Sequence, residues 1–162
     1  MGKFPDEVIE NIKSIFPKLA DDFGYDVSSP DDENYNCIAW AYNYKDRWMW
    51  PGGEECKTLD GFHYWPDGVK DETDVDAFID AFKLQGYEVC NSWEHEDGYR
   101  KIALYVKEGK CTHASRELVG SENTCGKWSS KLGKSNDIEH GTPYTIEGDI
   151  YGEVYCFMKI AF

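Results

Sequence analysis

The cysteine at position 37 has the residue type and surroundings of a nucleophile. It stands in the run Asn-Tyr-Asn-Cys-Ile-Ala-Trp-Ala at positions 34–41, where a polar loop changes into an apolar helical segment. Either Asn34 or Asn36 is a candidate cap for this helix, which would place Cys37 among free backbone amides at the positive end of the helix dipole. Such surroundings favour a thiolate over a thiol. The alternative is a small cysteine that only packs in the core.

A thiol nucleophile also needs a base, and His113 is the candidate. This histidine follows a predicted turn at Glu108-Gly109-Lys110 and lies near the start of a predicted strand. Alternation along that strand would place Cys111, His113 and Ser115 on one face. Small neighbours beside the histidine would let the cysteine helix approach. The alternative is a structural histidine satisfied within the core.

A third polar group is needed to orient the imidazole, and the polar segment at positions 135–140 offers two candidates. Asp137 is the first choice, and His140 is the alternate. An extended segment would point Ile138 and His140 to one side and Asp137 and Glu139 to the other, whereas at the start of a helix Asp137 would be a cap. For an oxyanion hole, the side-chain amide of Asn36 or Asn34 could join the backbone N–H of the cysteine, although both asparagines also fit as plain helix caps.

Apolar periodicity places these residues in an α+β fold. We expect one domain over residues 1–162, in which N-terminal helices pack on a C-terminal antiparallel sheet of about five strands. A central segment, Tyr42 to Trp65, is rich in aromatic residues and turns and is expected to have little regular structure. The expected helices are 5–16, 36–44 and 74–85, and the expected strands are 87–90, 99–106, 111–118, 124–132 and 151–162.

The net charge narrows the classes of partner. Seventeen Lys and Arg against thirty-one Asp and Glu give a formal charge of −14, which opposes binding to nucleic acid. The acidity suits a basic protein partner, or an inhibitor that mimics DNA, although it also serves solubility. We find no apolar run of membrane-spanning length and no secretory leader, so the sequence predicts no membrane contact and a cytoplasmic location.

The six cysteines are spread singly along the chain, without a C-x-x-C pair. This spacing favours free thiols over a disulfide framework or a structural zinc site, so no metal and no other cofactor is expected. The aromatic residues between Tyr42 and Trp65 suggest a third kind of function, a sugar-binding platform. Packing of a long loop against the domain is the simpler interpretation of these rings.

Four stretches resemble a family of small bacterial proteins known as a domain of unknown function. They are Tyr-Asn-Cys-Ile-Ala-Trp-Ala at 35–41, Gly-Tyr-Arg-Lys-Ile-Ala-Leu-Tyr at 98–105, Thr-His-Ala-Ser-Arg-Glu-Leu at 112–118, and Lys-Trp-Ser-Ser-Lys-Leu-Gly with Asp-Ile-Glu-His within 127–140. The resemblance covers most of the chain and implies a bacterial or phage source, but no reaction. The order of Cys37, His113 and a later polar residue is also distantly similar to papain-like and NlpC/P60-like hydrolases.

The sequence therefore leads to three hypotheses. In the first, the chain is a papain-like cysteine hydrolase or transferase that acts on an amide bond in a protein or peptide, through Cys37, His113 and either Asp137 or His140. The second is a noncatalytic acidic module that binds a basic protein. In the third, the aromatic segment binds a sugar. The reactivity of Cys37 compared with the other five thiols would separate the first two.

Overall fold

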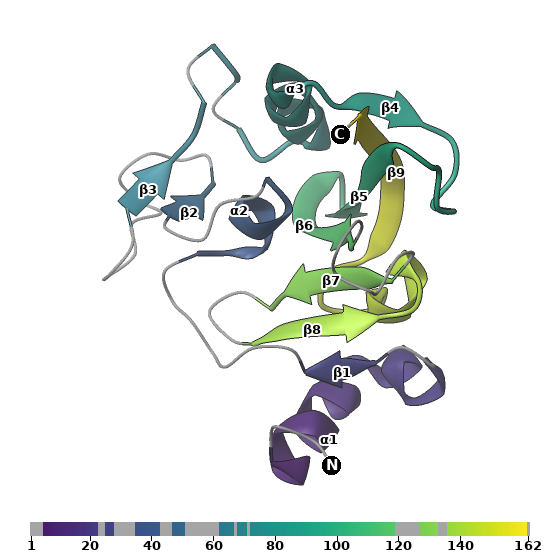
Figure 1. Ribbon diagram of the computed structural model, residues 1–162. Helices are drawn as coiled ribbons and strands as arrows, with labels where there is room; N and C mark the ends of the chain where they lie inside the picture. The colour runs from purple at the N-terminus through teal and green to yellow at the C-terminus, as the bar shows by residue number, and fades with distance from the viewer. Residues whose placement is uncertain are drawn as a thin grey trace.

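The fold is organised around one antiparallel sheet. The computed structural model describes residues 5–22, 25–27, 35–42, 47–50, 62–66, 68–70, 72–118, 127–132 and 136–161. Within these ranges the sheet has seven strands in the order β1-β8-β7-β6-β5-β9-β4 (Figure 1). They are β1 (Asp26–Val27), β4 (Glu88–Cys90), β5 (Tyr99–Lys107), β6 (Lys110–Glu117), β7 (Trp128–Lys131), β8 (Asp137–His140) and β9 (Glu153–Ala161).

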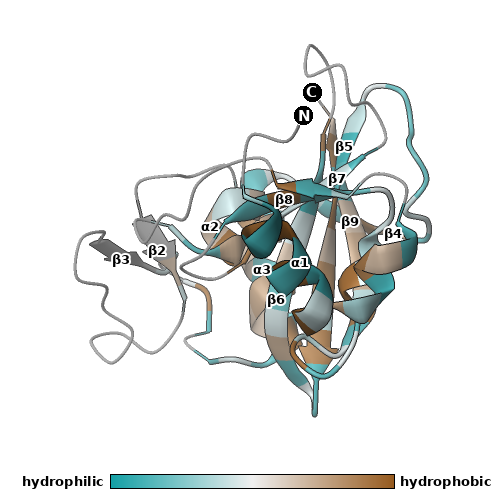
Figure 2. Cartoon of the chain, turned by 90° about the horizontal axis from the view of Figure 1, so that it is seen from below, coloured by the Kyte–Doolittle hydropathy of each residue, from teal (hydrophilic) through white to brown (hydrophobic). Residues whose placement is uncertain are grey.

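The α-helices of the described residues are α1 (Asp6–Ile15), α2 (Cys37–Ala41) and α3 (Val75–Gln85). A short helix η1 (Pro17–Asp21) follows α1 because Pro17 has no backbone N–H to extend it. Gly86 ends α3 in a left-handed conformation, φ 110°, and its amide donates to the carbonyl of Lys83. Hydrophilic and hydrophobic residues alternate along the helices in Figure 2, as expected of helices with one buried face.

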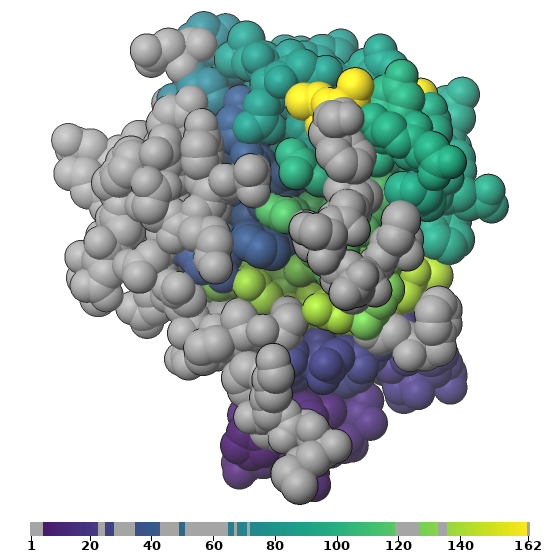
Figure 3. All heavy atoms as spheres, viewed as in Figure 1, coloured from purple at the N-terminus to yellow at the C-terminus, as the bar shows by residue number. Residues whose placement is uncertain are grey.

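The sheet separates two apolar layers, and β5 shows how. Ile102 and Leu104 lie in a core cluster with α2 and α3, whereas Ala103 and Tyr105 lie in a second cluster with α1. Successive residues of a strand point to opposite faces, so the two clusters cover the two faces of the sheet. In Figure 3, α1 forms the lower end of the molecule, and α3 and β4 lie at the upper end.

A bulge in β6 changes which of its side chains share a face. His113 pairs with Tyr105, but the next residue of β5 pairs with Cys111, so Thr112 is an extra residue on β6. His113 contacts Tyr105 on one face, while Cys111 lies in the α2 cluster on the other. The prediction that Cys111 shares a face with His113 and Ser115 is therefore wrong, because strict alternation does not allow for an inserted residue.

The predicted antiparallel sheet is confirmed, but its predicted size is wrong. About five strands were expected, whereas the sheet has seven within the described residues, because β1 and β8 add to the edge beyond β7. The predicted helices 5–16 and 74–85 agree with α1 and α3 within one residue at each end. The aromatic segment contributes one element that was not expected, a parallel pair of β2 (Arg47–Met49) and β3 (Phe62–Tyr64).

Candidate active site around Cys37

Cys37 is the first residue of α2, as the sequence predicts, and Asn36 is the cap. The side-chain oxygen of Asn36 accepts hydrogen bonds from the amides of Ala39, at 3.0 Å, and Met49, at 3.1 Å. Its side-chain nitrogen donates to the carbonyl of Met49 at 2.9 Å. Asn36 therefore caps α2 and ties it to β2, which accounts for its polar atoms without an oxyanion role. Asn34 lies outside the described residues.

The thiol of Cys37 is buried, with 6% of the residue exposed. Burial raises its pKa to about 11, so the thiol is protonated at neutral pH. Several groups act in the opposite direction: the backbone amides of Ala114, Ile38 and Cys37 itself, and the ammonium group of Lys131. These groups favour a thiolate, although the thiol is neutral at rest because burial has the larger effect.

Lys131 belongs to a buried polar group beside α2. Its side chain is fully buried, and its ammonium nitrogen lies 4.8 Å from the centre of the Tyr35 ring. The hydroxyl of Tyr35 donates to Asp137 at 2.7 Å, and Asp137 faces Lys131 across the pair of β7 and β8. The aspartate predicted to orient His113 is thus bound to Tyr35 instead, two residues before Cys37 in the sequence.

His113 is fully buried and lies on the other face of β6 from the side chain of Ala114. Its ring stacks on Tyr151, with centroids 3.9 Å apart, and meets the edge of Tyr105 at 5.2 Å. Neither ring nitrogen has a hydrogen-bond partner among the described residues. Burial, with the nearby charge of His140, holds the imidazole pKa well below its usual range, so the ring is neutral at pH 7.

The expected Cys37–His113 hydrogen bond is not formed among the described residues. Cys37 lies in the core cluster on the α2 face of the sheet, whereas His113 contacts Tyr105 and Tyr151 of the cluster on the α1 face. Pairing of β6 with β7 covers only two positions, and ends before Ala114 and Lys131. The charge of Cys37 also contributes to the raised pKa of Tyr151, the residue whose ring stacks on His113.

His140, the alternate orienting group, contacts neither Cys37 nor His113 through a hydrogen bond. Its Nδ1 donates to the carbonyl of Thr142 at 2.7 Å, and the hydroxyl of Ser130 donates to its Nε2 at 2.8 Å. Burial lowers the pKa of this imidazole to about 4. His140 is therefore a satisfied core histidine that joins β8 to the neighbouring strand.

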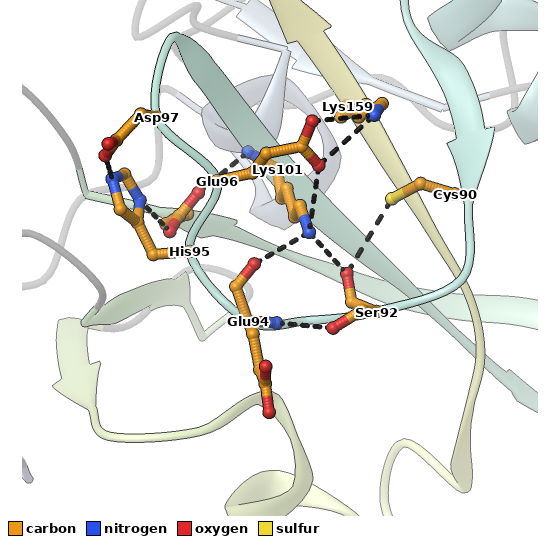
Figure 4. Close-up of polar contacts among 9 residues, drawn as sticks. Cys90, Ser92, Glu94, His95, Glu96, Asp97, Lys101 and Lys159 are labelled. Carbon is orange, nitrogen blue, oxygen red and sulfur yellow. Dashed lines mark hydrogen bonds and ion pairs between the residues drawn. The ribbon is translucent and has the colours of Figure 1, made fainter.

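A second polar cluster lies in the loop between β4 and β5 (Figure 4). The ammonium group of Lys101 donates to the carbonyls of Ser92 at 2.8 Å and Glu94 at 2.7 Å, and it lies 3.8 Å from the carboxylate of Glu96. Lys159 makes a closer ion pair with the same carboxylate at 3.0 Å. This cluster fixes the loop by saturating a buried ammonium group with acceptors.

The same loop is held to β6 through Glu117, whose side chain is fully buried. One carboxylate oxygen accepts from the backbone amide of Lys101 at 3.1 Å, and the other lies 2.8 Å from Nδ1 of His95. The opposite nitrogen of His95 lies 3.3 Å from the exposed carboxylate of Asp97. Burial raises the pKa of Glu117, while His95 and Lys101 act to lower it.

Sequence reasoning missed Lys131, Tyr35 and Tyr151 near the thiol. The run Trp-Ser-Ser-Lys offers one signal for Lys131, because alternation from Trp128 indicates the face of the strand on which the lysine lies. It does not indicate that this face is buried. His63 was also considered, and its side chain lies outside the described part. The described aromatics Trp50 and Trp65 pack edge-on against Phe78 of α3, at 5.1 and 5.0 Å.

Residues 26–159 match the family described as a domain of unknown function, DUF7689. The chain belongs to this family. The match spans both polar clusters and nearly all of the sheet, which agrees with the resemblance to a domain of unknown function seen in the sequence. No curated protein and no solved structure matches the chain. Among the described residues, no helix has the length and apolar character needed to cross a membrane.

Proposed function

We propose that the chain is a cysteine hydrolase or transferase that acts on an amide bond, with Cys37 as its nucleophile. The observation that carries this proposal is the position of Cys37 at the first residue of α2, where backbone amides and the ammonium group of Lys131 favour its thiolate against the effect of burial. Groups that favour a thiolate also favour the negative charge that develops on an attacked carbonyl oxygen. A helix-borne cysteine packed on an antiparallel sheet is compatible with a papain-like arrangement.

In the proposed reaction, the sulfur of Cys37 attacks the amide carbonyl and His113 accepts the thiol proton. That proton passes to the leaving amine as the C–N bond breaks, and water or a second nucleophile then releases the acyl group from sulfur. His113 suits this role because it is neutral and its nitrogens have no partner among the described residues. No hydrogen bond joins the pair among the described residues, so the proposed transfer requires the two side chains to approach each other when substrate binds.

The substrate in this proposal is a protein or peptide amide, and a basic or neutral one is favoured by the net charge of −14. A nucleophilic thiol must remain reduced, which is consistent with a cytoplasmic location.

Covalent labelling tests the proposal without a known substrate. Protein at pH 7 is treated with N-butyl chloroacetamide, an uncharged amide electrophile, and the labelled cysteines are identified by peptide mass spectrometry. We expect Cys37 to react faster than the half-buried Cys90 and Cys156, and Lys131→Met to slow its reaction at least tenfold. Lys127→Met is the matched control, because Lys127 pairs with Glu139 at 2.7 Å. Modification of Cys90 with Cys37 untouched would overturn the proposal.

A noncatalytic acidic binding module is the second candidate, and one observation favours it. A thiol with 6% exposure and a pKa raised to about 11 has the properties of a core cysteine. In this case the net charge of −14 serves to attract a basic protein. Cys37→Ala would then leave salt-dependent binding of a basic partner unchanged, and Cys37 would stay unlabelled in the experiment above.

A further inference from the structure

A pocket of about 330 Å³ lies between α1, the residues that follow β7 and precede β8, and the turn before β9. Most of its walls are apolar, and two asparagines are among its lining residues. The lining residues are Val8, Asn11, Ile12, Ile15, Phe16, Leu132, Asn136, Ile150 and Tyr151. The volume falls within the range of small-ligand sites in proteins.

Two large apolar side chains of this lining are open to solvent. Ile15 is 47% exposed and Ile150 is 52% exposed, although they come from segments far apart in the sequence. Adjacent exposed isoleucines around a pocket indicate a surface that gains free energy when an apolar group covers it. None of the lining residues carries a charge, so the pocket selects against charged ligands.

The wall formed by Ile150 and Tyr151 is held in place by its turn. Gly148 and Gly152 exchange backbone hydrogen bonds at 3.0 and 2.8 Å. A Cβ atom at Gly152, where φ is +76°, would lie 2.0 Å from the carbonyl oxygen of Val106, so the turn packs directly on β5. Thr112 of β6 also donates to the carbonyl of Tyr151. This wall of the pocket is therefore preformed.

Tyr151 lines this pocket and also contacts His113. One side of its ring stacks on His113 at 3.9 Å, the ring also packs against Phe16 at 5.3 Å, and its hydroxyl lies within the electrostatic influence of Cys37. The geometry points to this pocket as the binding site for an uncharged aliphatic group. This inference does not rest on the proposed function.

Binding of a neutral probe tests this inference. N-phenyl-1-naphthylamine is titrated into the full chain, its fluorescence is followed, and hexanamide is added as a competitor. We expect saturable binding that hexanamide displaces, and at least tenfold weaker binding in Ile15→Asn and Ile150→Asn. Leu84→Asn is the matched control, because Leu84 is 61% exposed on α3, away from the pocket. Equal affinity in wild type and both lining variants, or no saturable binding, would overturn the inference.

One further variant separates this inference from the proposed function. Cys37→Ala should bind the probe as tightly as the wild type, because Cys37 does not line the pocket. If the probe binds but Cys37 resists N-butyl chloroacetamide, the proposed function fails and the pocket remains a ligand site. If Cys37 is labelled but the lining variants bind the probe normally, the pocket assignment fails and the nucleophile remains.

Discussion

Two buried ionisable side chains of β6, Glu117 and His113, differ in their hydrogen-bond partners. Glu117 and His113 lie on the same face of this strand, four residues apart, and both side chains are fully buried. Glu117 accepts from the amide of Lys101 and pairs with His95. The two nitrogens of His113 have no hydrogen-bond partner among the described residues.

The presence or absence of hydrogen-bond partners distinguishes polar groups that support the fold from those available to a site. A buried polar group with all its partners contributes to stability, whereas one without a partner costs about 1–3 kcal/mol. A protein retains such a cost most readily where the group has another task. On this argument Glu117 supports the fold, whereas the unpartnered imidazole of His113 is what the proposed function would require.

The largest change in stability is expected at Glu117, because both of its carboxylate oxygens have partners. Glu117→Ala should lower the free energy of unfolding by about 3 kcal/mol, because it leaves the amide of Lys101 and the ring of His95 without their buried acceptor. Urea denaturation at pH 7 measures the loss. Glu117→Gln, which keeps one acceptor, should lose less, and equal stability of Glu117→Ala and wild type would break the comparison.

Substitution of His113 is expected to change the free energy of unfolding in the opposite direction. His113→Phe removes two buried nitrogens and keeps a ring that can stack on Tyr151, so it should raise the free energy of unfolding by about 1–2 kcal/mol. The same denaturation experiment measures it, with His140→Phe as a control. That control should destabilise the protein, because His140 loses its bonds to Ser130 and Thr142. Destabilisation by His113→Phe would show that the imidazole is structural.

The pH dependence of stability sharpens the same contrast. The folded pKa of His113 lies well below its unfolded value, so the unfolded state binds the proton first as the pH falls. Stability from this group is present at pH 7 and is lost as the pH falls below about 6.5. Between pH 7 and 5.5, wild type should lose about 1 kcal/mol more than His113→Phe. Parallel losses in the two proteins would contradict a neutral buried imidazole.

The smallest effect is expected for Asp97→Asn. Asp97 lies 3.3 Å from His95, but its side chain is fully exposed, and exposed ion pairs contribute at most about 1 kcal/mol. The change in unfolding free energy should be within roughly 0.5 kcal/mol at physiological salt. A loss as large as that of Glu117→Ala would mean that the exposed and buried partners of His95 are equivalent.

The sequence predicted best the elements in which apolar residues recur at a regular spacing. The apolar repeat before Gly86 and the cap at Asn36 define α3 and the start of α2 through local interactions alone. The strand Asp137–His140 was left undecided between extended and helical, because it is short and its pairing with β7 depends on residues distant in sequence.

The candidate site was harder to predict than the fold. Cys37 was placed correctly at its helix, but its base and orienting group depend on which faces meet. The bulge at Thr112 and the early end of the β6–β7 pairing decide those faces, and neither has a signature in a single sequence. Lys131 was missed because the burial of a lysine follows from tertiary packing and is rare among lysines in general.

The reaction rate of Cys37 in wild type and in His113→Phe tests most directly whether His113 serves Cys37 as its base. Both proteins are treated with N-butyl chloroacetamide at pH 7, and the labelled Cys37 peptide is quantified over time by mass spectrometry. If the unpartnered imidazole serves the thiol, His113→Phe should be more stable than wild type and should label Cys37 at least tenfold more slowly. Equal labelling rates in the two proteins would contradict a role of His113 in activating Cys37.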